Sequence, residues 1–237
     1  MRNVRGFTLI ELMIVIAIIA IIAAIAIPGL LQSQRASNER SASATLKTLS
    51  SAEVDFYSND RDGNGVKDFW TRDVSGFYTL CPLSSTDPLK LIELSVAAAD
   101  SNPQSTGAAP AAATHVASTF FGVRAPKAGF WYITMLTDQA GGAYAMSTNG
   151  APPFDQPWFN LTRYAFLAFP DGYSSGRQLF IINEDHTVLK RGLAGSVRPS
   201  GSAPPGSALV QTGAAGSTPI LAWPTDTQLR DDYSKLD

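Results

Sequence analysis

Residues 7–31 read FTLIELMIVIAIIAIIAAIAIPGLL, a run of 25 residues in which Glu11, near the start, is the one charged side chain. A helix rises about 1.5 Å per residue, so this run is long enough to cross a hydrocarbon core about 30 Å thick. The six residues before it, MRNVRG, include two arginines. Positive flanks stay on the cytoplasmic side of a membrane. We therefore expect a single-pass protein with a cytoplasmic N-terminus and the rest of the chain outside.

A secretory signal peptide is the competing interpretation of this run. Its small-residue cleavage site should follow the apolar residues. The run instead ends in Ile27, Pro28, Gly29 and Leu30 without a convincing site, and a glycine, Gly6, lies directly before it. The sequence therefore favours a leader that is cut before the apolar segment.

Residues 5–12, RGFTLIEL, followed by the apolar run and Ile27-Pro28, resemble the class III leader and N-terminal helix of type IV pilins and type II secretion pseudopilins. The resemblance is close over this helix and loose over the remainder. It implies cleavage between Gly6 and Phe7 by a prepilin peptidase, with N-methylation of the new Phe7 amine by the same enzyme. It also implies an inner-membrane assembly platform as a partner.

Glu11 and Pro28 are the candidate assembly residues. A carboxylate near the edge of the hydrocarbon is costly unless it is paired, and the resemblance supplies a partner, the free Phe7 amine of an adjacent subunit. The alternative is a carboxylate that reaches toward the headgroups. Pro28 removes one helical hydrogen bond and should kink the helix where it leaves the bilayer.

Beyond Pro28 the pattern becomes amphipathic. Apolar side chains recur at helical spacing, with charged residues between them: Ala42, Leu46, Leu49, Ala52 and Phe56. Such a stripe predicts a helix face packed against a globular head. We expect one helix over residues 8–57, roughly 75 Å long. Residues 1–6 would be the leader, 7–31 the membrane segment and 32–57 the part that contacts the head.

Residues 59–71, NDRDGNGVKDFWT, end this helix with two glycines and a concentration of acids. Counted from Asp60, their spacing matches the ligand positions of an EF-hand loop, with Gly65 at the sharp turn. The predicted calcium ligands are Asp60, Asp62, Asn64, Val66 and Asp68. Thr71 stands where such loops carry a bidentate acid, so binding should be weak. The alternative is a solvated turn rich in Asp and Asn.

The head, residues 58–237, contains apolar runs separated by short turns, which favours an antiparallel meander. The predicted strands are Phe130–Thr137, Ala143–Ser147, Arg163–Phe169, Gln178–Asn183 and Thr187–Arg191. A short helix is expected from Asp87-Pro88 to about residue 97, and surface loops over 97–118 and 194–219. The fold class is therefore α+β, a long helix packed on an antiparallel sheet, which is also the pilin architecture.

Composition and motifs argue against several other classes. The 18 Lys and Arg residues against 20 Asp and Glu create no basic field for nucleic acid. Cys81 is the one cysteine, so no intrachain disulfide forms, and we expect it to be buried. The GxSxG sequence at 172–176 precedes a strand-like segment, whereas a nucleophile elbow needs a helix there. His186 lies in a polar turn, where we expect a solvated side chain. We expect no enzyme.

Three functions fit the sequence. The first is a subunit of a type II secretion pseudopilus, which the incomplete calcium loop and the missing C-terminal disulfide favour. The second is a subunit of a surface pilus for adhesion or motility. The third is a membrane-tethered binding domain that never polymerises. The first two have the chain itself as partner, in a homopolymer or a mixed filament. All three place the chain in a bacterial inner membrane with lipid around it, and filaments would be periplasmic or extracellular.

Overall fold

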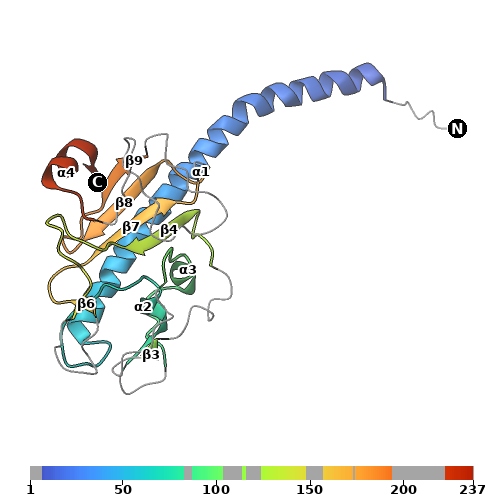
Figure 1. Ribbon diagram of the computed structural model, residues 1–237. Coiled ribbons are helices and arrows are strands. Elements are labelled where there is room, and N and C mark those ends of the chain that lie inside the picture. The colour runs from blue at the N-terminus through green and yellow to red at the C-terminus, as the bar shows by residue number, and fades with distance from the viewer. Residues whose placement is uncertain are drawn as a thin grey trace.

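One long helix, α1 (Leu9–Asn59), extends from the N-terminal end of the molecule and runs along the head (Figure 1). The computed structural model describes residues 7–82, 87–103, 114–115, 124–147, 157–172, 174–193 and 222–236. The helix expected over residues 8–57 is confirmed to within two residues at its end. It continues through Pro28 without interruption, and Figure 1 shows it curving as it leaves the head.

Within the described residues, the strands of the head form three antiparallel sheets. The largest has the strand order β10-β9-β8-β7-β4. Its strands are β4 (Phe130–Thr134), β7 (Ala165–Pro170), β8 (Gln178–Asn183), β9 (Leu189–Gly192) and β10 (Ser234–Lys235). A smaller sheet has the order β1-β6-β5, formed by β1 (Phe69–Trp70), β6 (Pro157–Asn160) and β5 (Met146–Ser147). The third pairs β2 (Leu80–Cys81) with β3 (Thr114–His115).

Three short helices complete the described elements: α2 (Gly76–Thr79), α3 (Leu94–Ala97) and α4 (Asp226–Asp232). The α+β class and the antiparallel arrangement predicted from the sequence are confirmed. Cys81 is buried, as expected.

The large sheet is covered on both faces, which explains why its central strands are continuous apolar runs. Alternate strand residues point to opposite faces. Tyr132, Phe166 and Phe180 belong to the cluster that packs on α1, whereas Leu167 and Ile181 belong to a second cluster on the other face, with Trp223 and Tyr233 from the C-terminal segment.

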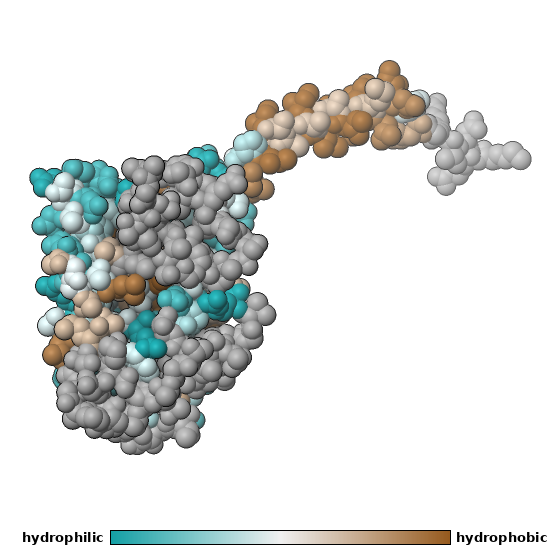
Figure 2. Space-filling view, in the orientation of Figure 1, coloured by the Kyte–Doolittle hydropathy of each residue, from teal (hydrophilic) through white to brown (hydrophobic). Residues whose placement is uncertain are grey.

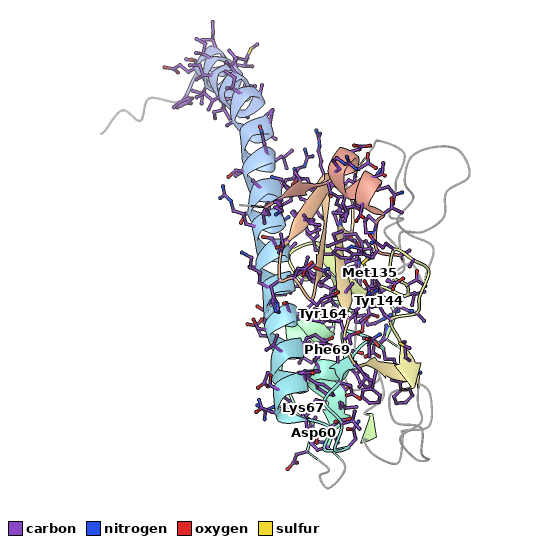
Figure 3. All side chains as sticks on the ribbon, turned by 90° about the vertical axis from the view of Figure 1, so that its left-hand side faces the viewer. Asp60, Lys67, Phe69, Met135, Tyr144 and Tyr164 are labelled. Atoms are coloured by element: carbon purple, nitrogen blue, oxygen red, sulfur yellow. The ribbon has the colours of Figure 1, made fainter. Side chains whose placement is uncertain are left out.

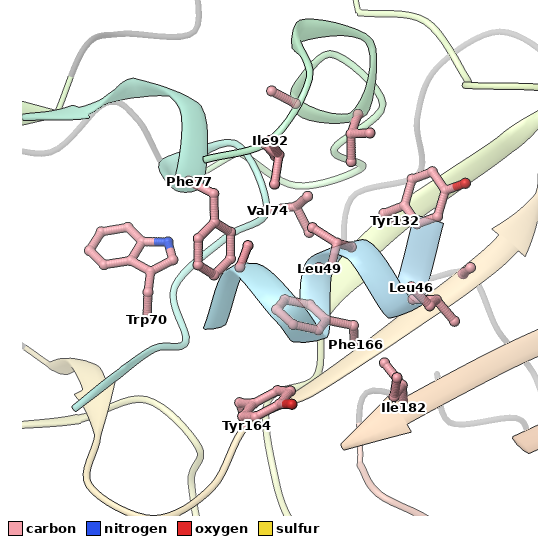
Figure 4. Close-up of a cluster of buried hydrophobic side chains, with 14 of the residues drawn as sticks. Leu46, Leu49, Trp70, Val74, Phe77, Ile92, Tyr132, Tyr164, Phe166 and Ile182 are labelled. Atoms are coloured by element: carbon pink, nitrogen blue, oxygen red, sulfur yellow. The ribbon is translucent and has the colours of Figure 1, made fainter. Parts of the chain in front are cut away.

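The cluster beneath α1 is centred on the second half of that helix. Leu46 and Leu49 are completely buried and lie near Tyr132, Phe166 and Ile182 (Figure 4). The helix contacts β1, β7 and β8. The amphipathic stripe of the sequence therefore faces the head, as predicted.

The helix predicted from Asp87 is wrong over residues 87–93, because α3 begins at Leu94. Lys90 has a positive φ of 51°. The amides of Leu89 and Leu91 donate to the carbonyls of Leu80 and Phe77, both at 2.8 Å. These contacts with α2 and β2 hold the segment in an irregular, non-helical path and override its local helical pattern.

Two predicted strands are also too long. The segment between Thr134 and Met146 closes into a turn, in which the Asp138 amide donates to the Gly142 carbonyl at 2.8 Å. Within the predicted loop 97–118, residues 114–115 form β3, and most of that loop, like loop 194–219, lies outside the described residues.

Candidate functional site

The first half of α1 presents apolar side chains on all sides. From Phe7 to Leu31 its large apolar side chains are 46–79% exposed. Figure 2 shows this half as an apolar rod that projects from the head. In the part of the chain that the structure describes, α1 is the one helix long and apolar enough to cross a membrane. A helix satisfies its own backbone hydrogen bonds, so such a segment is suited to lipid or to contact with other apolar helices.

Glu11 closes the N-terminal end of α1 in a capping box with Thr8. The carboxylate Oε2 accepts from the Thr8 amide at 2.9 Å and from the Thr8 hydroxyl at 2.6 Å. The Thr8 Oγ1 in turn accepts from the Glu11 amide at 3.3 Å. This pairing was not predicted, although Thr-x-x-Glu before an apolar run is its signature. Glu11 thus has a partner within its own chain.

Phe7 lies immediately before this box, so a chain that begins there would place its amine beside the first turn of α1. Gly6, the other residue of the predicted cleavage site, lies outside the described residues. Pro28 lies near the other end of the exposed half.

The five predicted calcium ligands lie in one loop at the end of the head far from the apolar half of α1, where Figure 3 labels Asp60 and Lys67. Asp60 ends α1 in the left-handed region, with φ of 46°. Its Oδ2 accepts from the Gly65 amide at 3.0 Å, and the Asn64 side chain accepts from the Val66 amide at 2.6 Å. The second of these bonds is an Asx turn, in which a side-chain oxygen accepts from the backbone amide two residues on.

Two of the loop acids, Asp62 and Asp68, are buried, with exposed fractions of 0% and 1%. The Oδ2 atom of Asp62 is enclosed and accepts no hydrogen bond. Burial raises the pKa of Asp62 to about 8, and the neighbouring Asp68 and Asp60 add to the rise. A buried carboxyl that stays protonated near neutral pH avoids an uncompensated charge. Within the described residues, no group of three or more His, Cys, Asp or Glu side chains has the arrangement of a metal site.

Glu53 is a further buried acid that was not predicted. It is fully buried on α1 and accepts from the Trp70 amide at 3.1 Å. Burial raises its pKa well above the usual range, and the charge of Asp68 adds to this. Glu53 lies four residues after Leu49 and three before Phe56, so helical spacing places it on the buried face. That spacing is the signal that could have found it.

The GxSxG sequence lies between β7 and β8, so it connects two strands, as predicted, and forms no nucleophile elbow. The carbonyl of Ser175 accepts from the Asn38 amide side chain at 3.1 Å, which ties this connection to α1. His186 is exposed, as expected, but it also has contacts that were not predicted. Its Nδ1 hydrogen-bonds the hydroxyl of Ser50 and lies 3.2 Å from that of Tyr164.

The apolar first half of α1 projects from an α+β head, and its second half continues into the core of that head. This is the architecture of pilin-like proteins. The comparisons agree with this class. Residues 1–27 match the prokaryotic N-terminal methylation motif. The chain is 56% identical over 54 residues to the type IV major pilin protein PilA of Myxococcus xanthus, a match that covers 23% of this chain and 24% of that protein. It is 59% identical over 46 residues to the type IV wide pilus major component PilA4 of Thermus thermophilus, covering 19% and 35%.

Over this N-terminal segment the chain is similar to type IV pilins. The chain matches only about a quarter to a third of the lengths of these two relatives. No solved structure matches it significantly. The names of both relatives describe major components of type IV pili.

The buried carboxyl of Asp62 predicts a pH-dependent stability in the presence of a chelator. The unfolded carboxyl ionises near 3.8, whereas the folded one stays protonated up to about 8. The folded state therefore binds more protons in this range, and the free energy of unfolding should fall as the pH rises through it. Asp62→Asn keeps a neutral side chain, so it should weaken this slope and stabilise the protein near pH 8 by on the order of 1 kcal/mol.

The measurement is thermal unfolding of the full chain in non-ionic detergent, followed by circular dichroism at several pH values with chelator present. Asp231→Asn is the matched control, because Asp231 is exposed on α4 and should leave the slope unchanged. An Asp62→Asn variant with the slope of the wild type would contradict the prediction.

Proposed function

We propose that this chain is a structural subunit of a type IV pilus-like filament, held in a membrane by the first half of α1 until it is assembled. The observation that carries the proposal is the exposed apolar half of α1, which bears the methylation motif and is continuous with the core of a folded head. In a filament, the same apolar side chains would exchange lipid for the helices of neighbouring subunits.

The names of the two relatives support a pilus rather than a secretion pseudopilus. The pseudopilus remains the alternative, because the acid-rich loop is the feature that favours it. In either case we propose a cytoplasmic N-terminus, a head outside the inner membrane, and a prepilin peptidase and an assembly platform as partners. Deleting the gene separates the two: loss of surface filaments supports the pilus, and loss of protein secretion with filaments intact supports the pseudopilus.

We further propose that Glu11 changes partner during assembly. In the single chain its carboxylate is held by Thr8. Cleavage after Gly6 creates a positive amine on Phe7, and the amine of an adjacent subunit could approach the same carboxylate. An ion pair in an apolar environment is much stronger than one in water. Pairing of this kind would fix the axial position of each subunit.

Calcium is a further proposal for the loop from Asp60 to Asp68. Its support is the enclosed Oδ2 of Asp62 and the electrostatic repulsion that Asp68 and Asp60 exert on this carboxyl. A divalent cation would remove that repulsion and stabilise the ionised form. With Thr71 in place of the last acid, we expect a dissociation constant of about 10⁻⁴ to 10⁻³ M, as in extracellular modules.

Leader processing gives the first test of the proposed function. Protein from its native host should begin at a methylated Phe7, because the peptide bond after Gly6 is the predicted cleavage site. Intact mass and N-terminal sequencing measure this directly. A chain that begins at Met1, or one cut after Pro28, would contradict it.

The role of Glu11 is tested by Glu11→Ala and Glu11→Val. Both variants should enter the membrane normally, since removing a charge lowers the cost of insertion. Filaments should become few or absent, because the Phe7 amine of the next subunit loses its partner. Thr8→Val is the informative control: it removes the hydroxyl of the capping box but keeps the carboxylate, so filaments should persist. Normal filament yield from both Glu11 variants would contradict the assembly role of Glu11.

Calcium binding is tested by the thermal midpoint of the full chain in millimolar calcium and in chelator. A ligand that binds only the folded state raises its stability by mass action. The rise should be larger near pH 8 than near pH 5, because protons compete with the metal for Asp62. Asp60→Ala and Asp62→Ala should abolish the rise, and Asp231→Asn should keep it. Equal midpoints in calcium and chelator would leave only a solvated turn.

A further inference from the structure

A basic groove lies at the base of the head, between α1 and the strands β8 and β9. Its first part is a cavity of about 440 Å³ that starts at Pro28 and is lined by Arg35, Glu39 and Arg177. A second cavity of about 220 Å³ adjoins it, shares Glu39, and is lined by Arg40 and Lys190 together with Phe180. Figure 1 shows β8 and β9 at the end of the head from which the first half of α1 emerges.

The four basic side chains of this groove, which we call the basic groove residues, are Arg35, Arg40, Arg177 and Lys190. Within the described part of the chain, none of them forms an ion pair, although several other basic residues do. The Nε of Arg35 is enclosed and has no hydrogen-bond partner. The acid of the groove, Glu39, is already engaged, because its Oε1 accepts from the backbone amide of Arg177 at 2.8 Å. The groove therefore has unused positive charge and unused donors.

The groove lies at a defined height relative to the apolar segment. Leu31 ends the run of exposed apolar side chains. Arg35 follows it by four residues, which is a rise of about 6 Å along the helix. The headgroup layer on each side of a bilayer is about 5–8 Å thick. A chain that spans the membrane with residues 7–31 thus places the Arg35 guanidinium at the level of the lipid phosphates.

We propose that the basic groove binds the phosphate of an anionic phospholipid, with Arg35 and Arg177 as its main ligands. Guanidinium groups present paired N–H donors that match the oxygens of a phosphate. The acyl chains of the same lipid would continue along the apolar side chains of α1 below Pro28. This inference rests on the proposed membrane-anchored subunit and adds a specific lipid site to it.

A lipid bound here would hold the head against the bilayer while the subunit waits for assembly. Two contacts would then hold the protein in the membrane: the apolar half of α1 would contact the hydrocarbon, and the basic groove would contact the lipid phosphates. Extraction into a filament would require the lipid to leave or to be carried along. The bound lipid would therefore set part of the barrier to extraction.

The experiment is native mass spectrometry of the mature full chain in non-ionic detergent, with phosphatidylglycerol and phosphatidylcholine of identical acyl chains added in equal amounts. The wild type should retain phosphatidylglycerol in preference to phosphatidylcholine. Each basic residue near an anionic surface contributes a factor of about five. The double variant Arg35→Gln/Arg177→Gln should therefore lose about 25-fold of this preference, whereas Arg35→Lys/Arg177→Lys should keep most of it.

The matched control is Lys47→Gln/Lys67→Gln, which removes the same charge from exposed positions away from the groove. It should retain the preference of the wild type. Circular dichroism and thermal midpoints establish that each variant is folded. If the Gln double variant does not fold, the single variants Arg35→Gln and Arg177→Gln and the Lys double variant replace it. The measured quantity is the same, the ratio of retained phosphatidylglycerol to retained phosphatidylcholine.

Three outcomes overturn the inference. The first is equal retention of both lipids by the wild type. The second is full displacement of phosphatidylglycerol by equimolar inorganic phosphate, which would indicate a site for a free anion. The third is an unchanged lipid preference in the Gln double variant together with fewer filaments, which would assign the groove to acids of a neighbouring subunit. Filament yield is counted separately by electron microscopy, so the lipid site can fail while the proposed function stands.

Discussion

One continuous helix is exposed and apolar in its first half and packs into the core of the head in its second half. The arrangement of the rest of the molecule depends on this helix. The first half of α1 is apolar on every side and belongs in lipid or against other helices. The second half has one apolar face, on which Leu46 and Leu49 are completely buried. The helix is not interrupted between these halves. The position of the head is therefore tied directly to the position of the membrane segment.

The head is organised around the buried half of this helix. Without α1, one face of the large sheet would lose its cover, and Tyr132, Phe166 and Phe180 would be exposed to water. The opposite face needs a separate cover, which Trp223 and Tyr233 of the C-terminal segment supply. The ring of Tyr233 is itself held by Arg191 of β9, whose guanidinium carbon lies 5.6 Å from the ring centroid. The N-terminal helix thus covers one face of the large sheet, and the C-terminal segment covers the other face.

Periodicity predicted the parts of the structure that local sequence controls. The long helix and β8 follow from runs whose pattern is clear over many residues. Long-range contacts decided the rest. Residues 87–93 are not helical because the amides of Leu89 and Leu91 donate to the carbonyls of Leu80 and Phe77. β1 has only two residues, and its pairing with β6 joins residues about ninety positions apart, for which no local pattern exists.

The candidate sites divide in the same way. The spacing from Asp60 to Asp68 was visible in the sequence, but the burial of Asp62 and Asp68 was not, because it depends on packing of the head over the loop. The hydrogen bonds among Ser50, Tyr164 and His186 were equally invisible, since they join α1 to the turn after β8. The Thr8 capping box, in contrast, is a local motif that the sequence does contain. Polar side chains that are buried or hydrogen-bonded by residues distant in the sequence are therefore the part of the sites that sequence patterns do not reveal.

The two ends of the exposed half of α1 are chemically alike in one respect, because each carries charge at an edge of the apolar run. Glu11 and Arg35 are 24 residues apart, a rise of about 36 Å, slightly more than the hydrocarbon thickness of about 30 Å. An inserted chain can therefore place both groups in the interfacial layers at once. Moving the helix along its axis would draw at least one of them into hydrocarbon, where an unpaired charge is costly. In the proposed subunit, extraction from the membrane would therefore require new partners at both ends: the amine of a neighbouring Phe7 for Glu11, and a replacement for the lipid phosphate at Arg35. A filament that supplies the two together would make removal of the subunit from the bilayer and its addition to the growing end a single coupled step.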